Sequence, residues 1–248
     1  MHPRICLCGL LLAVSGAASA ITAEELIAKN LEAKGGRDAI KAIQSLHSTG
    51  KLSFTGDFSV DLALDTIVSR AGKVRQEASL QGMTSVQAYD GTEGWQIQPF
   101  GGRKDPEKLS ADDSKSLVDD ADIDGPLVDW QAKGSTIEYL GTEDVDGTAA
   151  HKLKVSEKDG DVKYFYFDPD YFLEIRTVTQ RKVRGSEQAL ESDLGNYEKV
   201  AGVYIPFSIE SGPKGAPKQQ KITLDKVEAN VPVDNAKFAF PASPAASK

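Results

Sequence analysis

The stretch Phe58-Ser-Val-Asp-Leu-Ala-Leu-Asp-Thr-Ile-Val68 alternates apolar and polar side chains along most of its length. In an extended chain Phe58, Val60, Leu62 and Leu64 fall on one face, and the residues between them fall on the other. A strand with one apolar and one largely polar face is typical of an antiparallel sheet that covers a core on one side. The pattern therefore predicts a β protein.

Strand-like runs of the same kind recur along the chain. They lie at 46–54, 72–80, 83–89, 94–99, 135–141, 150–156, 161–167, 171–183, 188–198, 202–210 and 218–228. Turn signals such as Asp90-Gly91 and Asp159-Gly160 separate them. Short turns predict an antiparallel meander of about 11–12 strands, which has to curl because so large a flat sheet is unfavourable.

Helical signals precede and interrupt this meander. Thr22-Ala-Glu-Glu25 is a capping box, and Gly35-Gly36 separates the helix that should follow from a second helical piece around Ile40. Asp105-Pro106 has the pattern of a helix start, and Leu127 to Lys133 predicts another short helical piece. The predicted fold is mainly β with α, an incomplete antiparallel barrel with a helical lid over its concave face.

Residues 1–20 have the pattern of a secretory signal peptide. Arg4 precedes an apolar run from Ile5 to Val14, and Ala18-Ser-Ala20 further on fits the small-residue rule for cleavage after Ala20. We therefore expect one exported domain over 21–241, in the Gram-negative periplasm, followed by a loose tail at 242–248. No later segment has the ~20 apolar residues of a spanning helix, so an integral membrane protein is not expected.

The cysteines and the charge balance restrict the chemistry. Both cysteines, Cys6 and Cys8, lie in the predicted leader, outside a lipidation motif, so the exported chain should carry neither lipid, disulfide nor reactive thiol. The chain has 29 Lys and Arg against 37 Asp and Glu, a formal net charge of −8. This excess of acid argues against binding of nucleic acid, whose phosphates require a basic surface.

No motif indicates a catalytic or metal site. Asp120-Ala-Asp-Ile-Asp-Gly125 matches the first half of a calcium loop, but the twelfth position is Gln131, which cannot supply the closing bidentate carboxylate. His47 and His151 stand alone in strand-like runs, and we interpret them as ordinary residues of a sheet face. The sequence also lacks a nucleophile elbow and a phosphate loop. We expect no enzyme, no metal and no cofactor.

One segment resembles a known family. Asp90-Gly-Thr-Glu-Gly-Trp95-Gln-Ile-Gln-Pro99-Phe100 is similar to a strand pair of the LolA-type periplasmic lipoprotein carriers. Upstream, Ile67-Val-Ser-Arg70 falls where that family has a Lys-Arg-Pro-Asn turn, although Ala71-Gly72 follows here and the Pro is absent. The resemblance implies that Arg70 helps to latch the lid.

Further collinear segments resemble the larger group of outer-membrane lipoprotein-sorting proteins. They are Ala33-Lys-Gly-Gly36, Leu80-Gln-Gly-Met-Thr84, Asp122-Ile-Asp-Gly-Pro-Leu-Val-Asp-Trp130, Asp144-Val-Asp-Gly147 and Val203-Tyr-Ile-Pro-Phe207. The resemblance implies a half-barrel whose concave apolar face binds the acyl chains of lipoproteins or lipids. Such a protein would receive its cargo from an inner-membrane donor and pass it to an outer-membrane acceptor.

Strand alternation and the aromatic clusters supply candidates for the lining of this trough, although periodicity does not tell which face is concave. They are Val60, Leu62, Leu64, Trp95, Ile97, Leu127, Trp130, Tyr164 and Tyr166. The same fold also serves as an envelope sensor or an interaction module that binds a lipid or a membrane protein. That alternative stays open, with a hydrolase as a third.

Overall fold

A computed structural model of the protein describes residues 21–56 and 59–241. These residues form thirteen strands and three α-helices, joined by turns and loops. The predicted leader and tail, and Phe58, lie outside these ranges. The helices are α1 (Ala23–Ala33), α2 (Arg37–Ala42) and α3 (Ala111–Asp120), with 3-10 turns η1 (Pro99–Gly101) and η2 (Asn235–Lys237). The strands are β1 (Ser45–Phe54), β2 (Val60–Ser69), β3 (Lys73–Leu80), β4 (Met83–Tyr89), β5 (Gly94–Gln98), β6 (Arg103–Lys108), β7 (Thr136–Val145), β8 (Thr148–Ser156), β9 (Val162–Phe167), β10 (Glu174–Val183), β11 (Ser186–Val200), β12 (Val203–Pro213) and β13 (Gln220–Ala229).

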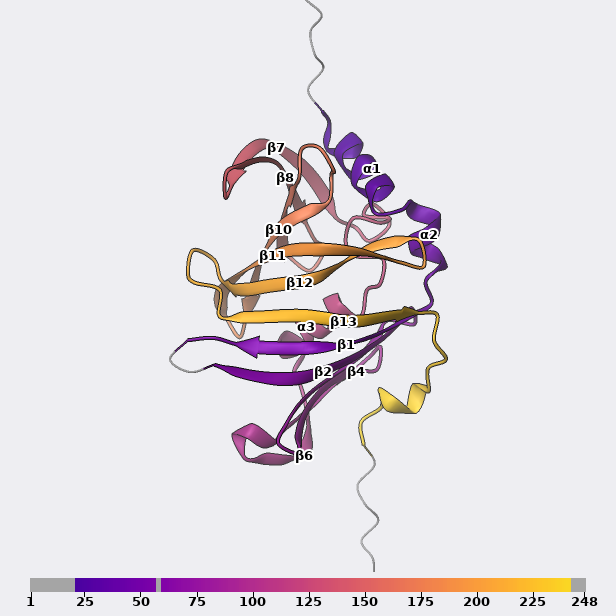
Figure 1. Cartoon of the computed structure of the whole chain (residues 1–248), viewed down its shortest axis with the longest axis vertical. Helices are drawn as coiled ribbons and strands as arrows, with labels where there is room; N and C mark the ends of the chain where they lie inside the picture. The colour runs from indigo at the N-terminus through magenta and orange to yellow at the C-terminus, as the bar shows by residue number, and fades with distance from the viewer. Residues whose placement is uncertain (1–20, 57–58, 242–248) are drawn as a thin grey trace, which may run out of the picture.

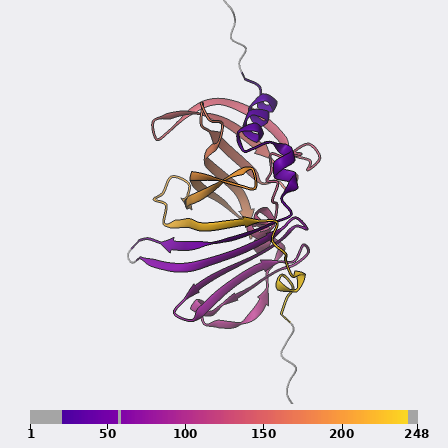
Figure 2. The ribbon, with the colours of Figure 1, turned by 45° about the vertical axis from the view of Figure 1, so that its right-hand side comes forward.

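All of these strands belong to one antiparallel sheet, in the order β6-β5-β4-β3-β2-β1-β13-β12-β11-β10-β9-β8-β7. The two edge strands, β6 and β7, do not pair with each other, so the sheet is an incomplete barrel, as the sequence predicts. The chain has to travel from one edge of the sheet to the other between β6 and β7. That crossing contains α3 and the turns at 121–135, and Figures 1 and 2 show it behind the central strands.

The first helix forms as predicted and covers one end of the sheet. The Thr22 hydroxyl accepts from the Glu25 amide (3.1 Å) and the Glu25 carboxylate accepts from the Thr22 amide (2.9 Å), which confirms the capping box. Leu26 and Ile27 on its inner side are buried. They form a core cluster with residues of β8 and β9 and with the turn segment after α3.

Two predicted helix boundaries are wrong. Asp105-Pro106 lies inside β6, an edge strand in which a proline need not donate to a neighbour, and the N-cap of α3 is Ser110, which accepts from the Asp113 amide. The segment Leu127 to Lys133 forms turns and not a helix. Asp129 there has φ +54°, a left-handed conformation that a right-handed helix cannot include.

The end of the chain crosses the convex face over β3 to β5. Trp95 is 1% exposed and its indole Nε1 donates to the Phe238 carbonyl over 2.7 Å. Phe238 is itself fully buried, and Arg75 donates to the Lys237 carbonyl over 3.0 Å. These contacts fix the segment after β13 as a strap on the outside of the sheet.

This strap should contribute substantially to stability. We expect Phe238→Ala to lower the free energy of unfolding by about 3–5 kcal/mol, since it empties a fully buried aromatic site. Phe240→Ala is the control, because Phe240 is 36% exposed and should cost much less. Chemical denaturation followed by far-ultraviolet circular dichroism measures both. Equal losses in the two variants would contradict the role of Phe238 as the anchor.

Candidate functional site

The concave face of the sheet is identified by its contacts with α3. Val68 of β2 and Val74 of β3 pack against Leu117 and Ala121 of this helix. Residues of β2 with the same parity as Val68 share its face, because β2 and β3 pair without a bulge.

An apolar stripe continues along this face on the central strands, away from α3. Leu62 and Leu64 are paired across the strands with Leu52 and Ala78, respectively. Cross-strand partners share a face, so all four side chains lie on the concave side. Most of them are only partly buried, and Leu62 is 7% exposed. The stripe is therefore an apolar surface that the described helices cover incompletely.

Helix α3 spans the concavity and is held differently on its two sides. Toward β3, Leu117 and Ala121 make apolar contacts, and Gly94 of β5 allows close approach, since a Cβ there would lie 2.3 Å from the Ser114 hydroxyl. Toward β9 and β10, Asp119 pairs with Arg181 (2.5 Å) and with Lys163 (2.9 Å). The helix therefore joins two distant parts of the sheet.

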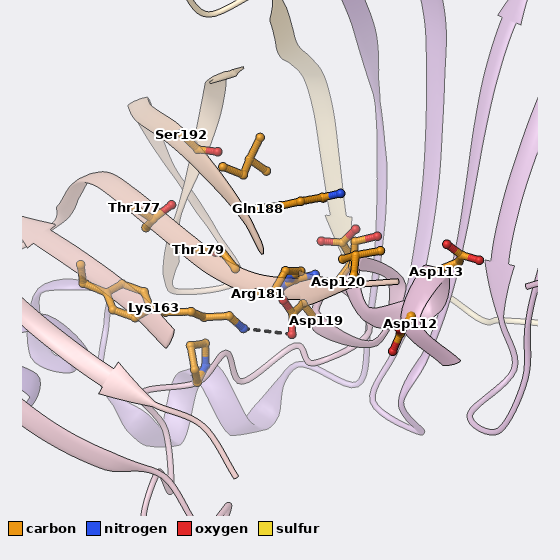
Figure 3. A pocket seen from close by; sticks show the side chains of 15 residues that line it. Asp112, Asp113, Asp119, Asp120, Lys163, Thr177, Thr179, Arg181, Gln188 and Ser192 are labelled. Atoms are coloured by element: carbon orange, nitrogen blue, oxygen red, sulfur yellow. Dashed lines mark hydrogen bonds and ion pairs between the residues drawn. The ribbon is translucent and has the colours of Figure 1, made fainter. Parts of the chain in front are cut away.

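A cavity of about 540 Å³ lies between α3 and strands β9 to β11 (Figure 3). The helix contributes an acidic wall, and the strands contribute a mixed floor with two cations. The lining residues are Asp112, Asp113, Ser116, Asp119, Asp120, Pro126, Lys163, Phe165, Thr177, Thr179, Arg181, Val183, Gln188, Leu190 and Ser192. This part of the concave face is thus considerably more polar than the stripe on β1 and β2.

The cations at the base of this cavity are almost buried and fully paired with carboxylates. Lys163 is 8% exposed and lies 3.1 Å from Glu157, whose pKa is raised because burial outweighs the attraction of that lysine. Arg181 lies 3.2 Å from Asp161, which also pairs with Lys115 of α3 over 2.6 Å. Glu157, Asp159 and Asp161 converge as metal ligands do, but these three cations already balance them.

A second cavity, of about 190 Å³, adjoins the first and lies beneath α1. The two share Pro126, Phe165 and Thr177 as lining residues. Its polar end contains the buried Glu174, which pairs with Lys34 over 3.2 Å. Tyr197 donates to the Glu174 carbonyl over 2.8 Å, and burial raises the pKa of this phenol. The two spaces therefore lie side by side on the concave side.

The structure brings only some of the predicted trough residues to this face. Val60, Leu62 and Leu64 lie on the concave side, while Leu127 and Trp130 pack in the core beneath α1, with Leu127 lining the second cavity. Trp95, Ile97, Tyr164 and Tyr166 lie on the opposite face and line neither cavity. The alternation pattern tells which residues of one strand share a face. It does not tell which of the two faces is concave.

Arg70, the predicted latch residue, connects the sheet with the helical layer. From the end of β2 its guanidinium donates to the carbonyl of Ile40 (2.7 Å) and to that of Ile43 at the end of α2. It also pairs with Asp124 in the turns after α3 over 2.7 Å. The carboxylates of the calcium-like motif therefore have separate partners, because Asp122 pairs with Lys133 and Asp120 accepts from Gln76.

The acidic wall of α3 is the feature that sequence reasoning missed. The sequence predicts that Asp119 and Asp120 are solvated residues of a helix end, whereas both line the larger cavity together with Asp112 and Asp113. Their spacing of seven residues places both pairs on one side of the helix, next to the buried Leu117. That signal was available in the sequence, but the cations that face it come from β9 and β10, which no local pattern reveals.

Comparison with known proteins shows the fold. No family model and no curated protein matches the sequence. The chain has the LolA-like fold seen in several solved structures. A DUF1329 family protein from Desulfovibrio piger is similar at a TM-score of 0.61 with 13% identity, covering 89% of this chain and 98% of that one.

Two further structures agree with this assignment. An outer membrane lipoprotein-sorting protein domain from Vibrio parahaemolyticus is similar at a TM-score of 0.57 and 9% identity, over 87% of this chain and 95% of that one. A LolA superfamily protein from Nitrosomonas europaea gives a TM-score of 0.57 and 13% identity, over 89% and 98%. Each described helix of the present chain is too short or too polar to span a bilayer.

Removing the Arg70 side chain should loosen the helical layer. We expect Arg70→Met to lower the free energy of unfolding by about 2–4 kcal/mol, since two carbonyls and Asp124 lose a charged donor. Amide hydrogen exchange should accelerate at residues 36–43 and 121–125. Arg184→Met is the matched control, because the Arg184 side chain is 74% exposed and its pair with Asp113 should contribute little. Unchanged amide hydrogen exchange in Arg70→Met would show that Arg70 does not hold the helical layer on the sheet.

One carboxyl group of the acidic wall, that of Asp120, should titrate in an unusual range. Burial of the carboxylate, together with the charge of Asp119, outweighs the hydrogen bond from Gln76 and raises the pKa of Asp120 to about 6. The protonated form is thus favoured by folding, and this contribution is lost as the pH rises through about 6. The residue still exposes part of its surface, so the effect on unfolding should be small.

Carbon-13 NMR of the aspartate carboxyls measures this titration directly. Gln76→Ala should raise the pKa of Asp120 further, because it removes the hydrogen bond that stabilises the ionised form. A titration of Asp120 near its ordinary value of 3.8 would contradict the assignment.

Proposed function

We propose that the protein is an exported, periplasmic carrier that binds acyl chains of lipoproteins or other lipids on the concave face and delivers them toward the outer membrane. The observation that carries this proposal is the apolar stripe around Leu62 and Leu64, which the helices cover incompletely. A soluble domain normally buries such a surface. Leaving it accessible inside a concave sheet is consistent with a surface kept for an apolar ligand.

The neighbouring structures support the same proposal. One of them is described as a lipoprotein-sorting domain and another as a LolA superfamily protein. The shared fold by itself fixes no cargo. It does provide the same arrangement of a curved sheet with helices on its concave side, in which a chain can lie along the stripe.

Binding and release, and not catalysis, would be the mechanism. Each methylene group moved from water to the stripe is favourable by about 0.8 kcal/mol, so several acyl chains supply ample affinity. Release then requires that the helical layer moves relative to the sheet, and Arg70 is the residue we propose as the latch between sheet and helices. Donor and acceptor proteins at the two membranes would complete the transfer.

A pair of adjacent positions tests the carrier function sharply. A photo-crosslinking amino acid at Leu62 points into the concave side, whereas the same group at Ala63 points outward from the next position of the same strand. After irradiation of intact cells of the native host, mass spectrometry should find acylated lipoproteins attached at Leu62 and not at Ala63.

Other adducts would lead to different conclusions. Adducts at Leu62 with free phospholipid only would refute lipoprotein sorting and favour a lipid carrier. A single unlipidated membrane protein as the adduct, at either position, would refute the carrier and favour a sensor or interaction module of the same fold.

A further inference from the structure

Exposed apolar side chains gather at one rim of the sheet. Within the described ranges eight large apolar residues are exposed, and four of them lie at this rim: Phe54, Met83, Phe100 and Leu190, with exposures of 38%, 40%, 42% and 51%. A single exposed apolar residue needs no explanation. Four of eight at the same end of a sheet indicate a surface with a function.

The register of the strands establishes that these residues share an end. Phe54 ends β1, Met83 begins β4, and Phe100 lies in η1 between β5 and β6, so they occupy or flank three successive hairpin turns on the same side. Leu190 pairs with Pro213 at the end of β12, next to the β12–β13 turn. We call this side the open rim and define it by residues 54, 80–83, 98–104, 190 and 213–218. Figure 1 shows the β1–β2 and β12–β13 hairpins on the side away from α2.

The open rim is continuous with the concave face. Phe54 has the parity of Leu52 and therefore extends the apolar stripe, and Met83 pairs with Leu80 at the end of β3. Leu190 lines the cavity of about 540 Å³. A ligand chain that leaves the stripe or the cavity along the strands therefore reaches these side chains first.

Charge at the open rim indicates what it contacts. Lys104, near Phe100, and Lys214, next to Pro213, are exposed and form no ion pair within the described ranges, and the same holds for Asp105 beside Lys104. Arg103 pairs only with Glu107. A bilayer interface with anionic headgroups takes apolar side chains into its outer layer and attracts such cations. Separate hairpin tips suit a deformable lipid surface better than a flat protein partner.

We propose that the open rim docks on an anionic lipid surface, so that acyl chains pass between the bilayer and the concave stripe at this point. This inference rests on the proposed carrier function and adds the place and the kind of surface at which loading or release occurs. Docking would be peripheral and reversible, since only a few side chains enter the interface.

Vesicle flotation of the exported chain, residues 21–248, tests the inference. The chain should float with vesicles of equal parts phosphatidylcholine and phosphatidylglycerol, and less with phosphatidylcholine alone. The triple variant Phe54→Ser, Met83→Ser, Phe100→Ser should reduce flotation by roughly tenfold or more, because each apolar tip contributes to interfacial binding. The matched control carries the same number of serine substitutions at Val118, Leu140 and Tyr171, which are exposed elsewhere. It should float like the unaltered chain.

A second variant separates charge from apolar insertion. Lys104→Glu with Lys214→Glu should lower flotation on the anionic vesicles only. Failure of the unaltered chain to float, or equal flotation of the triple variant and the matched control, would overturn docking at the open rim. Concentration-dependent association of the chain that the triple variant abolishes, without vesicle binding, would instead assign the rim to contact between copies.

Binding of a fluorescent fatty acid in solution, without vesicles, keeps the two proposals distinguishable. The double variant Met83→Ser, Phe100→Ser, which leaves the stripe residues Phe54, Leu62 and Leu64 in place, should bind this probe like the unaltered chain. Loss of probe binding in the unaltered chain would refute the carrier function, whereas normal probe binding without flotation would refute only the docking.

Discussion

The attachment of α3 across the concavity is the constraint on which the rest of the structure depends. Antiparallel neighbours account for every connection except the one from β6 to β7, which has to run from one edge of the sheet to the other. The chain satisfies this by placing α3 inside the curve. One side of the helix packs on Val74 and the other is held by Arg181 and Lys163 through Asp119. A flatter sheet could not make both contacts.

The asymmetry of this attachment determines where a ligand space can form. On the β3 side apolar packing buries Leu117 to 2% exposure, and the spaces beside α3 there are smaller, about 260 and 210 Å³. On the β10 side, the helix is joined to the strands through the side chains of Asp119, Lys163 and Arg181. A space of about 540 Å³ remains between helix and strands. Buried ion pairs contribute little net stability but specify geometry, so their value here is the spacing that they maintain.

How much of this the sequence predicts depends on the range of each interaction. Alternation at Leu62 and Leu64 and the capping box at Thr22 are local, and they gave the strands and the first helix correctly. The strand Arg103–Lys108 was missed because Asp105-Pro106 also fits a helix start, and only the neighbouring β5 decides between the two. Trp95 shows why the lining of the candidate site could not be predicted fully from the sequence. Its burial was foreseeable, but the partner that places it outside is Phe238, distant in the sequence.

The two faces of the sheet differ in how their apolar side chains are covered. The C-terminal strap covers Trp95 on the convex side, so that this aromatic surface is satisfied by the chain itself and is not available to a ligand. On the concave side Leu62 is buried, but its neighbours Leu52, Leu64 and Ala78 stay only partly buried. Helix α2, tied by Arg70, packs near Leu46 at the opposite end of β1, and α3 packs on Val68 and Val74. Uncovered apolar surface on the inside, and covered surface on the outside, is the arrangement that a carrier of apolar chains requires.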